Sequence, residues 1–162
     1  MATTDDVLKT LVSAGQVSDL SLELKRGQFA DRKFFGTKRF WEWYESVDDT
    51  VRDDKDVSPL DDLDILLESF VLGQSLDQPE QIHPMNHVTG IIWVLKTFDL
   101  RIYGAFPKFN TFLAYQGYPK ERVEKYNLYR GVCNEAEAAF KKMGLDVKSF
   151  IKTGNMTDVI ST

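Results

Sequence analysis

The chain has 162 residues, of which 43% are hydrophobic and 28% are charged, and its formal net charge is −5. These values fit one folded domain with a sizeable core and exclude a largely disordered chain. The longest apolar run, residues 91–95, is far too short to cross a bilayer, so we expect no membrane partner. The acidic balance also excludes a protein whose whole surface binds nucleic acid, although a local basic patch is compatible with it.

Cysteine usage and the N-terminal residues indicate a compartment. Cys133 is the single cysteine, so the chain forms no internal disulfide, which is typical of a reducing environment. The acidic first ten residues lack the apolar region of a signal peptide. We therefore expect a cytoplasmic, intracellular protein.

Motifs that would indicate an enzyme are missing from the sequence. It has no phosphate-binding loop, no nucleophile elbow and no H-E-x-x-H or C-x-x-C pattern, so we expect no cofactor and no catalytic residues. Glu80, His83 and His87 are close in sequence, but Pro84 disfavours the helical spacing that metal-binding pairs use, and we expect no metal. An enzyme whose site forms only in the fold, around His83, His87 or Cys133, stays an alternative.

The N-terminal third of the chain predicts two helices. Thr4 can cap the first, which Gly15 would end, and Thr37 opens a second that runs to about residue 53. Between them, residues 17–25 alternate leucine with polar residues, which is strand spacing, but no partner strand is evident elsewhere. The alternation therefore does not change the helical interpretation.

The middle of the chain has the clearest start of a helix and the most apolar segment. Ser58 is a good N-cap, Pro59 suits the first helical position, and Gly73 would end the helix. Residues 86–99 are apolar on every side at their centre, which we interpret as a helix buried in the middle of a bundle. Residues 100–118 hold glycines and a proline, and they predict a loop with a short helix.

The C-terminal part predicts more helix. Pro119 opens a helical segment that ends at Gly144, and a short helix follows at residues 146–152. Residues 1–154 are thus expected to form a single helical domain, and residues 155–162 a flexible tail. The fold class that follows is all-α, an irregular bundle of about six or seven helices around the buried helix at 86–99.

Charge is unevenly distributed along the chain. Residues 1–94 carry 9 Lys and Arg against 18 Asp and Glu, whereas residues 95–162 carry 11 against 7. Eleven of the acids fall between Glu42 and Glu68, directly after a basic segment. Such polarity suits head-to-tail self-association, in which an acidic face of one copy meets a basic face of the next. The alternative is an acidic loop that only contacts solvent.

Two segments combine cations with aromatic rings, which is how proteins bind single-stranded nucleic acid without sequence preference. The alternative for both is that the rings pack in the core and the cations reach out to water. The first segment is residues 25–41 and the second is residues 96–130. The candidate binding residues are Lys25, Arg26, Arg32, Lys33, Lys38, Arg39, Lys96, Arg101, Lys108, Tyr115, Tyr118, Lys120, Arg122, Lys125 and Arg130.

These observations lead to one preferred function and one alternative. We expect a non-enzymatic binding or assembly module that acts through self-association or through another protein. The alternative is an RNA-binding protein of the nucleoprotein or coat type, which would hold single-stranded RNA with the two basic and aromatic segments.

Overall fold

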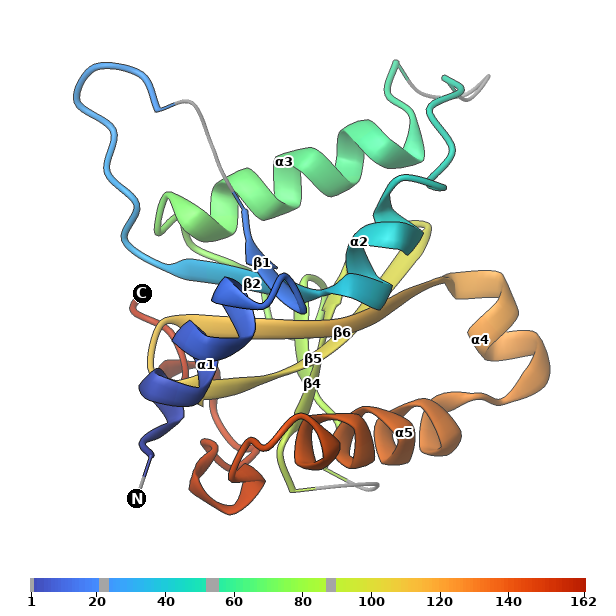
Figure 1. Ribbon diagram of the computed structural model, residues 1–162. Coiled ribbons are helices and arrows are strands. Elements are labelled where there is room, and N and C mark those ends of the chain that lie inside the picture. Colours follow the sequence, from blue (N-terminus) through green and yellow to red (C-terminus); the bar gives the residue numbers. More distant parts are fainter. Residues whose placement is uncertain (1, 21–23, 52–55, 87–89) are drawn as a thin grey trace.

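The computed structural model describes residues 2–20, 24–51, 56–86 and 90–162, and it has a mixed β-sheet at its centre (Figure 1). The strand order is β1-β2-β6-β5-β4-β3, and all neighbours are antiparallel except β2 and β6, which are parallel. The strands are β1 (Val17–Asp19), β2 (Lys33–Thr37), β3 (Ile82–Pro84), β4 (Ile92–Lys96), β5 (Leu100–Lys108) and β6 (Thr111–Pro119).

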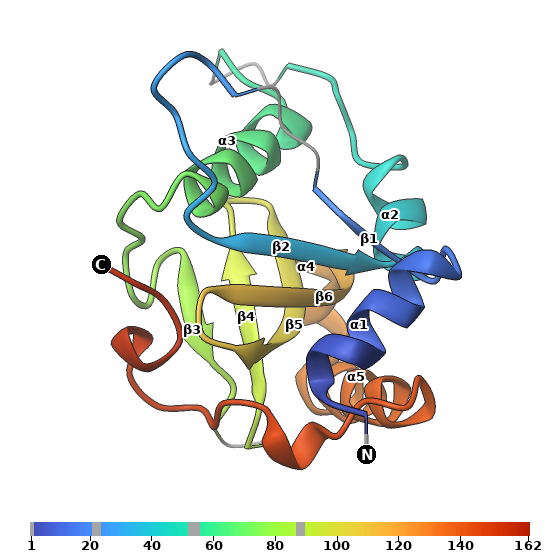
Figure 2. The ribbon, with the colours of Figure 1, turned by 60° about the vertical axis from the view of Figure 1, so that its left-hand side comes forward.

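Helices cover both faces of the sheet, and the two views agree on this layering (Figures 1 and 2). One face packs against α1 and α5, and the other packs against α2 and α3. The helices in the described residues are α1 (Thr4–Ser13), α2 (Lys38–Tyr44), α3 (Pro59–Val71), α4 (Lys120–Tyr126), α5 (Tyr129–Lys142) and the 3-10 turns η1 (Val147–Ser149) and η2 (Met156–Asp158).

The expectation of an all-α helical bundle is therefore wrong, and the segment expected as its central helix is the clearest error. Residues 92–96 form β4, an inner strand between β3 and β5, while residues 87–89 lie outside the described part of the chain. Trp93 and Leu95 enter the core on the α3 side, and Ile92 and Val94 enter the core on the α5 side. A strand that is buried on both faces is apolar at every position. A short apolar run therefore lacks the alternation of apolar and polar residues that would distinguish a strand from a buried helix.

The second error concerns residues 100–118, expected as a loop with a short helix. They form the β5–β6 hairpin, whose register shifts between Tyr103 and Gly104. A Cβ at Gly104 would meet the Leu113 carbonyl oxygen and the Phe112 ring, so the glycine permits close strand approach. The glycines and the proline in this segment therefore mark strand irregularities and not loop structure.

Several predicted helix boundaries are confirmed. Ser58 caps α3 with Pro59 at its first turn, Thr37 caps α2, and α5 runs to Lys142 before Gly144, which has a φ of +88°. The helix after Thr37 ends at Tyr44, however, and does not continue to residue 53.

The C-terminal residues pack against the rest of the protein. Val159 and Ile160 are buried on the α3 side of the sheet, and the Asn110 backbone N–H donates to the Val159 carbonyl at 2.8 Å. The flexible tail expected for residues 155–162 stays a prediction.

Candidate functional site

The fifteen candidate binding residues lie in separate parts of the molecule. Lys25 and Arg26 are exposed in the loop before β2, Lys38 is exposed at the start of α2, and Arg130 is exposed on α5. The remaining residues belong to a core cluster, a surface network, a pocket with an adjoining surface, and a groove at the opposite end of the sheet.

Arg32 belongs to the core, with only 1% of its surface exposed. Its Nη1 donates to the carbonyls of Phe70 at 3.1 Å and Gln74 at 2.9 Å, and its Nη2 donates to the Ser161 carbonyl at 2.6 Å. The guanidinium therefore ties the end of α3 to the C-terminal segment, a structural role that leaves it turned away from solvent.

Arg39 belongs to a surface network that joins α2, β6 and α5. Its Nε donates to Gln116 Oε1 at 2.6 Å, and its Nη2 lies 3.4 Å from Glu135 Oε1. The Tyr115 hydroxyl donates to the same Glu135 oxygen at 2.7 Å, and burial is the main cause that raises the pKa of Tyr115 and of Tyr118. Each of these donors already has an acceptor within the protein. The network therefore connects α5 to the sheet and to α2.

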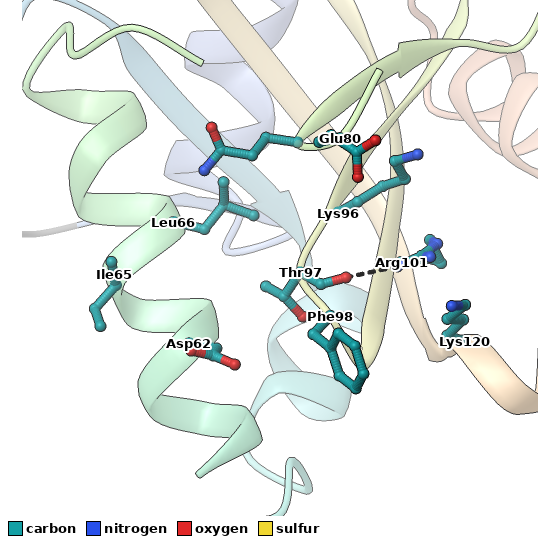
Figure 3. Close-up of a pocket in the computed structure, with 10 residues that line it drawn as sticks. Asp62, Ile65, Leu66, Glu80, Lys96, Thr97, Phe98, Arg101 and Lys120 are labelled. Carbon is teal, nitrogen blue, oxygen red and sulfur yellow. Dashed lines mark hydrogen bonds between the residues drawn. The ribbon is translucent and has the colours of Figure 1, made fainter. Parts of the chain in front are cut away.

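The pocket lies where β4 turns into β5, between α3 and the start of α4 (Figure 3). We call it the hairpin pocket, and its volume is about 520 Å³. Its lining consists of Asp62, Ile65, Leu66, Glu80, Gln81, Lys96, Thr97, Phe98, Arg101 and Lys120.

Strand register brings the cations of the hairpin pocket together. Lys96 at the end of β4 lies opposite Arg101 near the start of β5, and Arg101 lies opposite Tyr118 on β6. Directly opposed residues share one face of a sheet, so these three side chains form a row across three strands. Lys120 follows directly after β6, which adds a third cation from the first turn of α4.

The turn between the two strands holds Arg101 in place. Its Nη1 donates to the Thr97 carbonyl at 2.7 Å and to the Leu100 carbonyl at 2.9 Å. The Leu100 backbone N–H donates to Thr97 Oγ1 at 3.0 Å, which closes the same turn. At its tip Phe98 is 64% exposed, and Lys120 Nζ lies 5.8 Å from the centre of its ring. A rigid turn thus presents an open ring beside fixed positive charge.

The electrostatics of the hairpin pocket are mixed. Burial lowers the pKa of Lys96, and the nearby positive charges of Arg101 and Lys120 lower it further, while Glu80 acts in the opposite direction. Asp62, in the first turn of α3, lines the opposite wall. An anion that entered would relieve the repulsion among the three cations, whereas the two carboxylates would favour hydrogen-bond donors.

The surface continues from the hairpin pocket around α4 and carries both signs of charge, because Asp48, Asp99, Glu121 and Glu124 line the hollow between them together with Lys120. A second hollow is lined by Arg122, Lys125 and Tyr126, and an intervening hollow shares Phe98 and Lys120 with the hairpin pocket. Tyr126 is 61% exposed, and Lys125 Nζ lies 5.4 Å from its ring centre. Two open rings, each with a lysine beside it, therefore lie along one continuous surface.

Lys33 and Lys108 lie far from this surface, in a hollow of about 590 Å³ between α1 and the β5–β6 turn. We call this hollow the α1 groove. Lys9 also lines it, and Lys108 Nζ pairs with Asp5 Oδ1 at 2.7 Å. Because Lys108 ends β5 and Arg101 lies near its start, the groove and the hairpin pocket occupy opposite ends of the sheet.

Cys133 and His83 are the described residues around which a site was considered. Cys133 is fully buried, and burial raises the pKa of its thiol to about 12, so the reactive thiolate is disfavoured. His83 lies half-buried on β3, and His87 is outside the described residues. Within residues 2–20, 24–51, 56–86 and 90–162, no three His, Cys, Asp or Glu side chains gather as a potential metal site.

Sequence reasoning did not select Asp62, Glu80 or Phe98 as binding residues. Phe98 and Asp99 sit in a polar break between an apolar run and an alternating segment, which is the pattern of a hairpin turn. Asp62 lies in the first turn of α3, where a negative charge favours the helix start, and its place in the lining of the hairpin pocket follows only from the three-dimensional fold.

Comparisons with known proteins give no relative from which a fold or a site could be inferred. The sequence matches no protein-family model, and neither the curated proteins nor the solved structures contain a significant match. None of the helices in the described part of the chain has the length and apolar composition needed to span a membrane.

Proposed function

We propose that this protein binds single-stranded nucleic acid, with RNA the expected ligand, through the hairpin pocket and the adjoining surface of α4. The observation that carries the proposal is the grouping of Lys96, Arg101 and Lys120 at the β4–β5 turn, beside the largely exposed ring of Phe98. The cations would neutralise phosphates, and the ring would stack on a base.

The size and the extent of the surface support this ligand. A volume of about 520 Å³ falls within the range of about 300–1,000 Å³ for small-ligand sites, so one nucleotide fits the hairpin pocket. Arg122, Lys125 and Tyr126 continue the same chemistry around α4, which suits a ligand with repeated phosphates and bases. A single strand supplies unpaired bases to both rings, whereas a duplex hides its base faces.

The net charge of −5 is compatible with such a local site. Much of the negative charge lies between Glu42 and Glu68, whereas residues 95–162 carry an excess of cations. A site of three to five cations is expected to bind weakly at high salt, because counterion release is its main driving force.

Fluorescence anisotropy with a labelled single-stranded RNA of about ten nucleotides tests the proposal. Log affinity should fall linearly with log salt concentration, and Lys96→Gln or Lys120→Gln should each reduce the slope by about 0.7. Lys33→Gln, which removes the same charge at the α1 groove, is the matched control and should leave the slope unchanged. Equal effects of all three substitutions, or no binding, would overturn the proposal.

Self-association is a second candidate function, supported by the outer face of α3. Asp61, Asp64, Ile65 and Glu68 have the spacing of one helical face, and Ile65 is 56% exposed between the acids. The α1 groove of a second copy offers lysines above an apolar floor of Leu8 and Phe35. Contact between unlike faces would be heterologous and would form rings or filaments.

Light scattering at low and high salt tests self-association. Lys33→Glu should dissociate the assembly at low salt, and adding Glu68→Lys in the same chain should restore it, because opposite charges again face each other. A monomer at all salt concentrations, or an assembly that persists in 1 M salt, would rule out this interface.

A further inference from the structure

Lys96 and Arg101 carry the same charge and lie directly opposite each other on β4 and β5. Like charges in this arrangement destabilise a sheet. The ion pairs among the described residues include neither side chain, so no carboxylate in this part of the chain neutralises the two cations at close range. An anion bound by both cations would remove their mutual repulsion.

The two cations lie on the α5 side of the sheet, at the end where β4 turns into β5. Val94, two residues before Lys96, packs in the core on that side, as does Tyr103, two residues after Arg101. Side chains two residues apart share a face of a strand, so both cations belong to the same face. Because α3 packs against the other face, this pair of cations is directed away from the acids of α3.

Arg101 has donors that remain for a ligand. Its Nη1 donates to the carbonyls of Thr97 and Leu100, which fixes the guanidinium at the turn (Figure 3). Its Nε and Nη2 form no hydrogen bond to another described residue. These two nitrogens share one edge of the guanidinium and can donate two parallel hydrogen bonds to a single phosphate group.

Two positive charges in opposed positions match a phosphate monoester better than a diester. A diester within a strand carries one negative charge, whereas a monoester carries about 1.5 to 2 at neutral pH and has three acceptor oxygens. Burial is the main cause that lowers the pKa of Lys96, and the charge of Arg101 lowers it further, while Glu80 acts in the opposite direction without forming an ion pair. Lys120 contributes less to this match, because its Nζ lies 3.9 Å from Glu124 Oε1.

We propose that Lys96 and Arg101 bind the terminal phosphate monoester of the nucleic-acid strand. This inference rests on the proposed nucleic-acid binding and names the part of the ligand that the hairpin pocket recognises. The terminal nucleoside would then lie beside Phe98, whose largely exposed ring is at the tip of the same turn. A free nucleotide carries the same monoester, which makes it the second source of this chemistry.

Uridine nonamers with a fluorophore on the central base test the assignment by anisotropy at low salt and about pH 8, where the monoester is fully ionised. The strands carry hydroxyl groups at both ends, a 5′-phosphate, or a 3′-phosphate. At least one phosphorylated strand should bind about tenfold more tightly than the strand with hydroxyl ends, because a hydrogen bond to a charged group contributes about that factor. Methyl esterification of the preferred phosphate removes one charge and should abolish most of this gain.

Lys96→Gln should remove most of the preference for the phosphorylated strand. Lys125→Gln is the matched control, since it removes one charge from an exposed position on α4, outside the hairpin pocket. This control should weaken the binding of all strands by the same factor and keep the preference. Thermal unfolding checks both variants, and the methyl ester comparison on the unaltered protein tests the assignment without any variant.

The outcomes separate this inference from the function on which it rests. Equal affinity for phosphorylated and unphosphorylated strands, with a normal salt dependence, would overturn the terminal-phosphate assignment and leave nucleic-acid binding intact. A preference that survives Lys96→Gln would overturn the role of Lys96. Displacement of the phosphorylated strand by an equal concentration of uridine 5′-monophosphate would identify a free nucleotide as the ligand and overturn recognition of a strand end. Failure of every strand to bind would overturn both proposals.

Discussion

Arg32 and Arg101 come from the two basic and aromatic segments, and both donate to backbone carbonyls, yet they belong to different kinds of region. Arg32 is buried, and its guanidinium joins three carbonyls, from α3, the loop after it and the C-terminal segment. Arg101 uses Nη1 for the turn at Thr97 and lies in the lining of the hairpin pocket. The comparison teaches that a cation among aromatic residues either stabilises the core or lines a surface pocket, depending on which faces the sheet buries.

The largest expected effect is the loss of the buried arginine. Arg32→Ala should lower the free energy of unfolding by about 3 kcal/mol or more, because it removes three hydrogen bonds made by a charged, buried guanidinium. Urea unfolding measures the change. Lys33→Ala, at the exposed neighbouring position, should stay within about 0.5 kcal/mol of the unaltered protein. Equal stability of the two variants would contradict the structural role of Arg32.

The next effect tests the sheet itself. Gly104→Ala should destabilise the protein by about 1–3 kcal/mol, since the added Cβ would clash with the Leu113 backbone and the Phe112 ring. Gly131→Ala, in α5, meets no atom within 4 Å and should stabilise the protein by up to about 1 kcal/mol through helix propensity. Thermal unfolding of both variants checks the pair. A harmless Gly104→Ala would argue against close strand approach at this position.

A smaller effect should fall on binding and leave stability unchanged. Phe98→Ala removes a ring that is 64% exposed, so unfolding should change little. Affinity for single-stranded RNA should fall by about fivefold to a hundredfold, because one base–ring stack is worth about 1–3 kcal/mol. Phe109→Ala, which removes a ring that is 50% exposed at the β5–β6 turn, is the control and should leave the affinity unchanged. Equal losses of RNA affinity in both variants would show that the two ends of the sheet do not differ in RNA binding.

The smallest effect concerns pH. The pKa of Lys96 is lowered mainly by burial, so its positive charge is lost at a lower pH than that of an ordinary lysine near about 10.4. Because the charged form contacts phosphate, RNA affinity should fall as the pH rises through this lowered pKa. Lys96→Arg keeps its charge and should retain affinity at higher pH. Identical pH profiles for the two proteins would show that Lys96 does not contact the ligand.

The helix boundaries could be predicted from sequence because their causes are local. Ser58 and Pro59 define the start of α3 within one turn, as expected, and the structure adds reciprocal hydrogen bonds between Ser58 and Asp61. The strands could not be predicted in this way. β4 is apolar on both faces, and β2 pairs in parallel with β6, a strand more than seventy residues away. Such pairings follow from long-range contacts that no local pattern reveals.

The cations of the hairpin pocket could be selected from the sequence, whereas their grouping in space could not. Lys96, Arg101 and Lys120 were selected as basic residues among aromatic ones, but so were Arg32 and Lys108, which lie elsewhere. Only the register of β4 with β5 and the position of α4 after β6 bring the first three together.

The most direct test of nucleic-acid binding at the hairpin pocket is ultraviolet cross-linking of the unaltered protein to a single-stranded RNA that contains 4-thiouridine. Mass spectrometry then identifies the cross-linked peptides. We expect cross-links within residues 96–101 and 118–126, with the Phe98 peptide the most prominent. Cross-links confined to the α1 groove around Lys33 and Lys108, or none at all, would contradict the proposed site.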